Sequence, residues 1–306
     1  MQARRSRRVV FRAGTVCSVG PLYLAIDIGG TKLAAGIVDD DGAVLVRDRV
    51  PTPARDVWPA VARLVKRVLA ASPQVPVGCG VGCGGPMVPA TGVVSPLHIP
   101  SWRNFPLREF AERLTDLPVA VDNDAKALAL AEGWCGAAVG VADFIGMVVG
   151  TGVGGGIVSG GRLLEGRLGN AGHIGHLVVE PDGRPCRCGG FGCLEAYCSG
   201  VAIEAETSRA PQRASTAIME RTGTLVGRAL ASVGAIVDLR LAVVGGSVAL
   251  GYGSVFFDAA QAELDARAKL TFTSGFRVVP VALGVQAPLV GAAALARSAY
   301  ATATRG

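Results

Sequence analysis

The sequence has no long hydrophobic run. None of its apolar stretches reaches the roughly 18 residues that a transmembrane helix needs. The N-terminus also carries no hydrophobic segment of the kind found in secretory signal peptides. We therefore expect a soluble protein with no membrane partner.

Charged residues are also scarce: they make up 18% of the 306 residues, and no acidic residue occurs among the first twelve. Arg4, Arg5, Arg7, Arg8 and Arg12 supply five of the six net positive charges, which leaves +1 for the rest of the chain. A nearly neutral body excludes a broad basic surface, so we expect no nucleic-acid partner. We interpret residues 1–20 as a disordered basic tail. Contact with an anionic partner and an organelle address are the alternatives.

Hydrophobic residues make up half of the chain, and its length suits two lobes better than one core. Apolar runs bounded by turn residues predict strands at residues 23–28, 33–38, 43–50 and 75–81. Helical spacing of apolar residues predicts a helix at residues 57–69, before the last of these strands. Strands around a glycine-rich turn recur at residues 144–149, 157–158 and 162–165. This recurrence predicts an internal duplication of an RNase H-like α/β layer.

Helices dominate the rest of the predicted pattern. They are expected at residues 110–114, 125–134, 194–207, 215–236, 254–268 and 292–300, with strands at 119–121, 241–244 and 277–283. We place an N-terminal lobe at residues 21–122 and a C-terminal lobe at residues 123–286. A C-terminal helix at about residues 287–306 is expected to pack back on the first lobe.

Cysteine and histidine are concentrated in one stretch of 23 residues that begins at His173. His176, Cys186, Cys188 and Cys193 lie there among glycines, whose flexible backbone lets sulfurs two and five residues apart converge. Three thiolates and one imidazole are a typical ligand set for tetrahedral Zn²⁺, and four protein ligands leave no open position on the metal. The sequence therefore predicts a structural zinc site. Ordinary reduced cysteines on a glycine-rich loop, or a CxC redox pair, are the alternatives.

Two polar side chains lie close in sequence to the proposed zinc ligands. His173 precedes the histidine ligand by three residues, and Glu195 follows the last cysteine ligand by two. A bound metal would fix both side chains, which suits the binding of a small hydroxylated molecule. The other five cysteines lie in apolar or glycine-rich stretches: Cys17, Cys79, Cys83, Cys135 and Cys198. Such surroundings suit buried thiols in a reducing compartment, so we expect the protein in the cytoplasm.

Two glycine-rich turns follow predicted strands. Asp27–Lys32 (DIGGTK) combines a carboxylate with unobstructed backbone amides, which suits phosphate and Mg²⁺, although a simple hairpin is the alternative. Gly150–Gly156 (GTGVGGG) matches neither a Walker A motif nor a Rossmann fingerprint, and we expect its glycine amides to be free. Two such turns on facing lobes suit a nucleoside triphosphate. The residues expected to contact it are Asp27, Gly29, Gly30, Thr31, Lys32, Thr151, Gly152, Gly154, Gly245 and Gly246.

Asp124 stands between the two predicted lobes, at the start of a predicted helix. An aspartate in this position serves as a helix cap or as a general base in the cleft, with Asn123 orienting a hydroxyl. One carboxylate can hardly perform both tasks fully. Both interpretations stay open at this point.

The motifs DIGGTK, VDNDAKALALAEGW, GTGVGGG, AGHIGH and CRCGGFGCLEAYCSG resemble, in order and spacing, the ROK family (repressors, open reading frames and kinases) of actin-like sugar kinases. The resemblance implies an actin-like ATPase fold with a cleft between two lobes, ATP as phosphate donor, Mg²⁺ held with the help of Asp27, and a homodimer. It also implies that Asp124 accepts the proton of the sugar 6-hydroxyl. Contacts to the sugar are implied for Asn123, His176 and Glu195.

Two histidines depart from the family pattern. His173 stands where glucokinase-like members carry a glutamate, and a neutral imidazole donates one hydrogen bond and accepts one, whereas a carboxylate only accepts. Bacterial N-acetylmannosamine kinases resemble the chain here, which favours a 2-acetamido sugar. His98 stands where relatives commonly have asparagine, either as a surface residue or as a contact on the sugar side.

We therefore expect an ATP-dependent kinase that phosphorylates the 6-hydroxyl of glucose or N-acetylmannosamine. A non-catalytic sugar sensor and a sugar-independent actin-like ATPase are the alternatives. The family's repressors carry an N-terminal helix-turn-helix domain, and the roughly twenty residues before the first predicted strand are too few for one.

Overall fold

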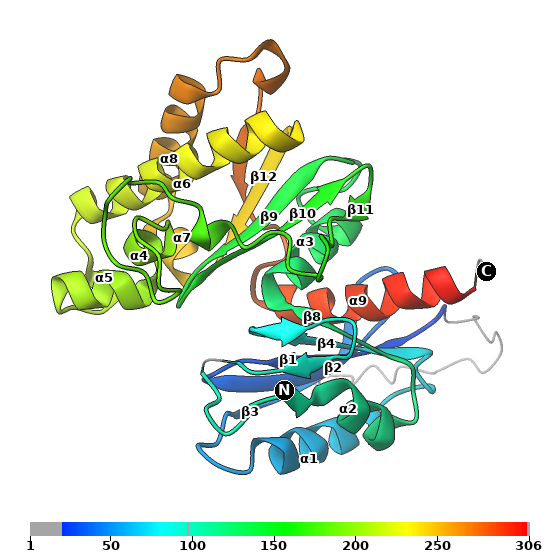
Figure 1. The fold of residues 1–306 in the computed structure, drawn as a ribbon. Helices are drawn as coiled ribbons and strands as arrows, with labels where there is room; N and C mark the ends of the chain where they lie inside the picture. Colours follow the sequence, from blue (N-terminus) through cyan, green and yellow to red (C-terminus); the bar gives the residue numbers. More distant parts are fainter. Residues whose placement is uncertain (1–19, 97, 305–306) are drawn as a thin grey trace, which may run out of the picture.

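A computed structural model describes residues 20–96 and 98–304, and Figure 1 shows the arrangement of their helices and strands. The arginine-rich residues 1–12 and Cys17 lie outside the described residues. Within the described ranges, no helix combines the length and the apolar character that crossing a membrane requires.

The first lobe is built on a five-stranded sheet. Its strands are β1 (Tyr23–Ile28), β2 (Lys32–Val38), β3 (Val44–Pro51), β4 (Gly78–Cys83) and β8 (Val119–Asn123). They are ordered β3-β2-β1-β4-β8. β1, β2 and β3 pair antiparallel in turn, whereas β1, β4 and β8 run parallel.

Different helices cover the two faces of this sheet. Every residue of β1 is buried, and successive side chains point to opposite faces. Leu24 therefore belongs to a core shared with α1 (Val57–Ala70), and Tyr23 to a core shared with α9 (Ala287–Ala303). The last helix of the chain thus returns to the first lobe, as its red ribbon shows in Figure 1.

A smaller insertion connects β4 to β8. It contains a three-stranded sheet of β5 (Met87–Val88), β6 (Val93–Val94) and β7 (Phe105–Pro106), followed by α2 (Leu107–Thr115).

The second lobe repeats the sheet of the first. Its strands are β9 (Phe144–Val149), β10 (Val153–Ser159), β11 (Arg162–Leu163), β12 (Leu241–Gly245) and β13 (Arg277–Pro280). Their order is β11-β10-β9-β12-β13, with β9 antiparallel to β10 and parallel to β12, as β1 is to β2 and β4. The shared order and directions confirm the expected RNase H-like layers.

α3 (Asp124–Cys135) packs on β9 and β10 and also contacts α9. Glycines of β10 allow the close approach: a Cβ at Gly156 would lie 2.7 Å from the Lys126 Cα, and one at Gly154 3.1 Å from the Ala125 Cβ. Our expectation that Gly154 and the next two glycines lie in a loop is wrong, because they lie inside β10. Gly154 and Gly156 face α3, whereas a Cβ at Gly155 would lie 3.0 Å from Cγ2 of Ile174 on the other face. The turn itself keeps only the first three residues of the motif.

The other long helices belong to the second lobe. The helix expected at residues 194–207 is broken at Ser199, whose hydroxyl accepts the Ala202 N–H and starts a new helix. The helices are α4 (Glu195–Cys198), α5 (Gly200–Thr207), α6 (Thr216–Val237), α7 (Ser247–Tyr252) and α8 (Ser254–Arg267). Short 3₁₀ helices are η1 (Ile174–His176), η2 (Pro211–Arg213), η3 (Thr271–Thr273) and η4 (Gly284–Gln286).

Candidate functional site

Two carboxylates meet where the parallel strands of the first sheet end. Asp27 lies in β1, and Asp124 begins α3 directly after β8 at the same edge of the sheet. Asp27 is 9% exposed, and its burial together with the charge of Asp124 raises its pKa to about 6, against a smaller opposing effect of Lys32. Part of the Asp124 residue is open to solvent. Protein atoms nevertheless surround its carboxylate, and this desolvation raises the Asp124 pKa as well. Two such crowded carboxylates fit a divalent cation such as Mg²⁺, which prefers oxygen ligands.

Replacing Asp27 by Asn is expected to stabilise the fold at neutral pH. Because the pKa rises from 3.8 to about 6 on folding, stability falls as pH rises through this window, and the loss is complete above it. Removing the charge should recover roughly 3 kcal/mol at most. Thermal unfolding in magnesium-free buffer should give D27N a higher Tm than the wild type at pH 7.5, with a difference that shrinks toward pH 4. A lower Tm for D27N at pH 7.5 would show that the charge of Asp27 does not destabilise the folded protein.

Asn123 caps α3. Its Oδ1 accepts the Ala125 N–H at 2.9 Å, and Oδ1 of Asp124, the first helical residue, accepts the same N–H at 2.9 Å. The helix therefore has a cap without Asp124. Within the described residues, no hydrogen bond involves Asp124 Oδ2, so this oxygen is available to a ligand in the cleft.

The first glycine turn is closed by its own backbone. The Gly29 N–H donates to the Lys32 carbonyl at 3.0 Å, and the Thr52 hydroxyl donates to the Gly29 carbonyl at 2.7 Å. Contrary to expectation, Gly29 has no free amide for a phosphate, whereas Gly30 and Thr31 are exposed. Thr52 follows β3, and no local motif in the sequence pointed to its supporting role.

His98 lies against this first turn. A Cβ at Gly30 would lie 2.7 Å from the His98 Cβ, and one at Gly84 would lie 2.5 Å from its Cε1, so the side chain passes between two glycines at the cleft. Burial raises the Asp124 pKa, and the charge of His98 acts in the opposite direction. Of the two interpretations of His98, the geometry favours a residue of the cleft, although the side chain remains exposed.

The second glycine turn lies beside the end of β12. The Gly150 N–H donates to the Gly152 carbonyl at 2.9 Å. A Cβ at Gly150 would lie 3.8 Å from the Cα of Gly246, which follows Gly245 with a φ of 97° that favours glycine. The structure thus brings these two predicted nucleotide-binding segments together, and Thr151 of the second turn is exposed.

Glu195 lies beside the second turn, and His173 lies near the cysteine cluster. Glu195 begins α4, and its Oε2 accepts the Val153 N–H at 2.9 Å. The rings of His173 and His176 lie 6.2 Å apart. One side of His173 is exposed, but burial of the other side lowers its pKa, and the charges of His176 and Lys126 lower it further. A lowered pKa favours the neutral imidazole of His173, which can donate one hydrogen bond and accept another.

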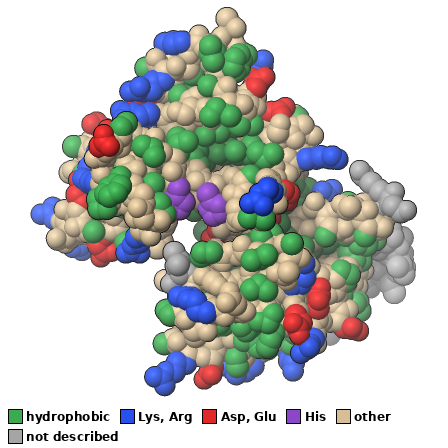
Figure 2. All heavy atoms as spheres, in the orientation of Figure 1, with side chains coloured by type: hydrophobic (Ala, Val, Ile, Leu, Met, Phe, Trp, Pro, Cys, Tyr) green, Lys and Arg blue, Asp and Glu red, His purple; other side chains and the backbone are tan. Residues whose placement is uncertain are grey.

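A cavity of about 10 Å³, space for about one water molecule, lies between the lobes. Asn123 and His173 line it, as do Asp122, Lys126 and Asn170, which the sequence did not single out. Figure 2 shows histidine side chains at the surface, above the notch between the two lobes.

The four proposed zinc ligands converge. Their ligand atoms lie within 4.8 Å of one another, with Cys186 Sγ 3.7 Å from His176 Nδ1 and Cys188 Sγ 3.8 Å from Cys193 Sγ. In a tetrahedron with metal–sulfur bonds of about 2.3 Å, ligand atoms are about 3.8 Å apart. This donor set therefore fits a zinc ion with all four positions taken.

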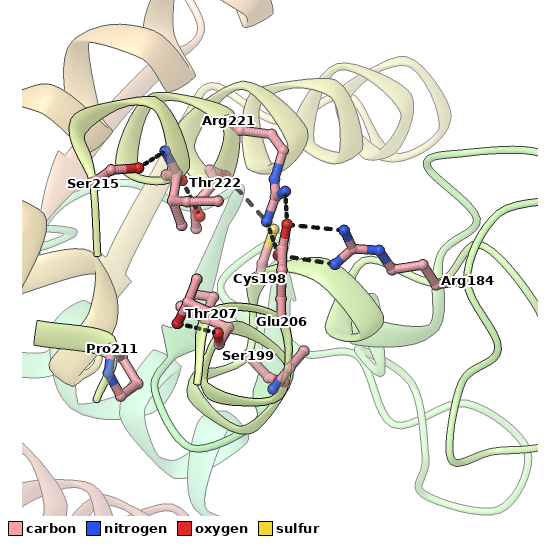
Figure 3. A network of polar contacts seen from close by, with 12 residues as sticks. Arg184, Cys198, Ser199, Glu206, Thr207, Pro211, Ser215, Arg221 and Thr222 are labelled. Atoms are coloured by element: carbon pink, nitrogen blue, oxygen red, sulfur yellow. Dashed lines mark hydrogen bonds and ion pairs between the residues drawn. The ribbon is translucent and has the colours of Figure 1, made fainter. Parts of the chain in front are cut away.

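An ion-pair network ties the zinc loop (residues 177–194) to the helices behind it. The carboxylate of Glu206 in α5 accepts two hydrogen bonds from Arg184 of the loop, at 2.9 and 3.0 Å (Figure 3). It accepts two more, both at 2.6 Å, from Nη1 and Nη2 of Arg221 in α6. The guanidinium groups of Arg221 and Arg184 lower the pKa of Glu206 to about 2. The Arg184 guanidinium also lies 4.7 Å from the centre of the Tyr197 ring. One side of the zinc loop is thus anchored without a metal.

Known proteins match nearly the whole described chain. The family model described as the ROK family matches residues 23–299. The N-acetylmannosamine kinase of Escherichia fergusonii is 38% identical over 250 residues, which cover 75% of this chain and 84% of that protein. The crystal structure of the ROK hexokinase from Thermus thermophilus superposes with a TM-score of 0.79 at 34% identity, over 92% of this chain and 99% of that one. The ROK family glucokinase from Streptomyces griseus, in complex with glucose and AMPPNP, gives a TM-score of 0.76 at 30% identity, over 90% and 99%. The chain therefore belongs to the ROK family.

Proposed function

We propose that the protein is an ATP-dependent kinase that transfers the γ-phosphate to the 6-hydroxyl of a hexose or N-acetylhexosamine. The observation that carries this proposal is the meeting of Asp27 and Asp124 at one edge of the first sheet, beside a glycine turn. Relatives named as kinases support it, including one whose structure holds both a sugar and AMPPNP, an ATP analogue.

Asp124 is the proposed general base. Its raised pKa makes it a stronger base than an ordinary carboxylate, and its Oδ2 is available to take the proton of the 6-hydroxyl. Asn123 uses its Oδ1 to cap α3. Its side-chain NH₂ is then the group that would orient the sugar, as a hydrogen-bond donor.

The glycine turns and Asp27 are the proposed nucleotide contacts. Asp27 would hold Mg²⁺, which neutralises phosphate charge during phosphoryl transfer. Gly30 and Thr31 of the first turn and Thr151 of the second are exposed and would contact the phosphates. Gly245–Gly246 would border the nucleoside, because this pair lies beside the second turn.

His173 is the proposed determinant of the sugar. A 2-acetamido group presents both an N–H donor and a carbonyl acceptor, and a neutral imidazole can pair with either, whereas a carboxylate pairs only with donors. Glu195 and His176 would add contacts from the zinc-braced side. We therefore place N-acetylmannosamine ahead of glucose as the substrate.

A phosphorylation assay over a sugar panel is expected to give the highest kcat/KM with N-acetylmannosamine. ADP release would be measured with glucose, mannose, glucosamine, N-acetylglucosamine and N-acetylmannosamine against a reaction without sugar. His173→Glu should shift the preference toward glucose by removing the donor. ADP release that does not depend on sugar would support an actin-like ATPase, and sugar binding without phosphate transfer would support a sensor.

A further inference from the structure

Lys126 is a buried cation that none of the roles above explains. It lies in the first turn of α3, two residues after Asp124, and its side chain is 3% exposed. Its Nζ lies 2.7 Å from Asp122 Oδ2, 2.8 Å from Glu165 Oε2 and 3.1 Å from the Gly169 carbonyl oxygen. Three acceptors thus satisfy the three N–H donors of the ammonium group.

This position is unfavourable for a lysine considered alone. Burial of an ammonium group is costly unless it is paired, and the N-terminus of a helix disfavours positive charge. An apolar side chain of similar volume is often as stable or more stable at such a site. The presence of Lys126 is therefore better explained by the groups that it joins than by the stability of α3.

The partners of Lys126 come from both lobes. Asp122 belongs to β8 of the first sheet, whereas Glu165 and Gly169 belong to residues 164–172, which we call the sugar-side loop and which follow β11 of the second sheet. This loop has no regular secondary structure, and most of its residues are exposed. In the part of the chain that the structure describes, Lys126 is the only side chain from outside the loop that hydrogen-bonds to it.

The sugar-side loop carries residues to the cavity between the lobes. Asn170 and the adjoining His173 line this cavity from one side, and Asn123 lines it from the other. The loop backbone turns at Gly166 and Gly169, whose φ angles are 71° and 75°. Bonds from one ammonium group near both turns fix the direction in which the loop enters the cavity.

We propose that Lys126 is a positioning residue that pins the sugar-side loop to the first lobe and thereby sets how tightly the sugar is bound. The effect on sugar binding rests on the proposed kinase function, whereas the pinning of the loop does not. Without the ammonium group, Asp122 and Glu165 would face each other as like charges. The loop would then move away from the wall that the first lobe supplies.

Lys126→Met keeps the apolar stem and removes the charge. Amide hydrogen exchange in residues 164–173 is expected to accelerate about tenfold, with exchange in α6 unchanged. The KM for the sugar should rise about tenfold, because the sugar-contacting groups lose their alignment, while kcat stays within about twofold and the KM for ATP is constant. Lys126→Arg keeps the charge and should restore part of both effects.

Glu165→Gln is the second variant, because the Glu165 side chain is 57% exposed and its replacement leaves the core intact. The same changes are expected, but smaller. Lys269→Met and Glu109→Gln are matched controls on exposed sites away from the loop and should change neither measurement. Unchanged loop exchange in both K126M and E165Q, or a fall in kcat at constant KM, would overturn the proposal. If the wild type phosphorylates no sugar, the exchange measurement alone still decides whether Lys126 pins the loop.

Discussion

Asp124→Asn should remove sugar phosphorylation while the fold stays intact. A general base typically contributes about a hundredfold to ten-thousandfold to a rate, and an amide cannot take its place, so kcat should fall by at least about a hundredfold. The amide oxygen can still accept the Ala125 N–H, as Asp124 Oδ1 does at 2.9 Å, and Asn123 keeps its cap. Because burial raises the Asp124 pKa, removal of the charge should raise the Tm at neutral pH. ADP release and thermal unfolding measure the two effects separately.

Asp116→Asn is the matched control, since Asp116 is an exposed aspartate at the end of α2, outside the cleft. This variant should behave like the wild type in both assays. The wild-type kcat/KM should also decline as pH falls through the raised pKa of Asp124, because only the unprotonated carboxylate accepts a proton. D124N with a normal kcat would exclude Asp124 from the chemistry.

Most of the fold is predictable because its central strands, such as β1 and β9, are mainly apolar and end at glycine turns. β1 and β9 match their expected ranges, and the repeat of strands around a glycine turn corresponds to two sheets of identical order. The break at Ser199 was missed because the apolar pattern continues through it. α7 spans only six residues, too few for a helical period to stand out.

The candidate site was predictable where its residues are close in sequence. The spacing of the cysteines and His176 was enough to propose the zinc cluster, and the ligand atoms do converge. The support given by Lys126 was not predictable, because its partners Glu165 and Gly169 lie 39 and 43 residues away. Thr52 is likewise 23 residues from Gly29. Contacts over such distances depend on how strands and helices distant in sequence pack together, which no local pattern encodes.

Removal of zinc should lower thermal stability and sugar affinity together. Within the described residues, the zinc loop contains no helix and no named strand, and isolated β-bridges join Val178 to Cys193 and Pro185 to Phe191, so the metal would supply much of its order. Loss of about 2–3 kcal/mol corresponds to a fall in Tm of roughly 3–5 °C for a chain of this size. Sugar affinity should fall at least about tenfold, because His176 and Glu195, which we propose contact the sugar, flank the loop. Metal analysis, thermal unfolding and calorimetric titration with sugar, before and after chelation, measure all three, and Zn²⁺ but not Mg²⁺ should reverse the losses.

Cys188→Ser should reproduce the metal-free state, because Cys188 is an exposed member of the cluster whose replacement leaves the core unchanged. Cys135→Ser is the control: Cys135 lies on α3, outside the cluster, and this variant should keep one zinc per chain. Without the metal, we expect the zinc loop to become disordered and Glu195 to be held less firmly. The bonds from Arg184 to Glu206 do not depend on the metal, so the second sheet should stay folded. Protein purified under reducing conditions without zinc, or a metal-free protein with unchanged Tm and sugar affinity, would show that the four side chains form only a cluster of reduced thiols and an imidazole.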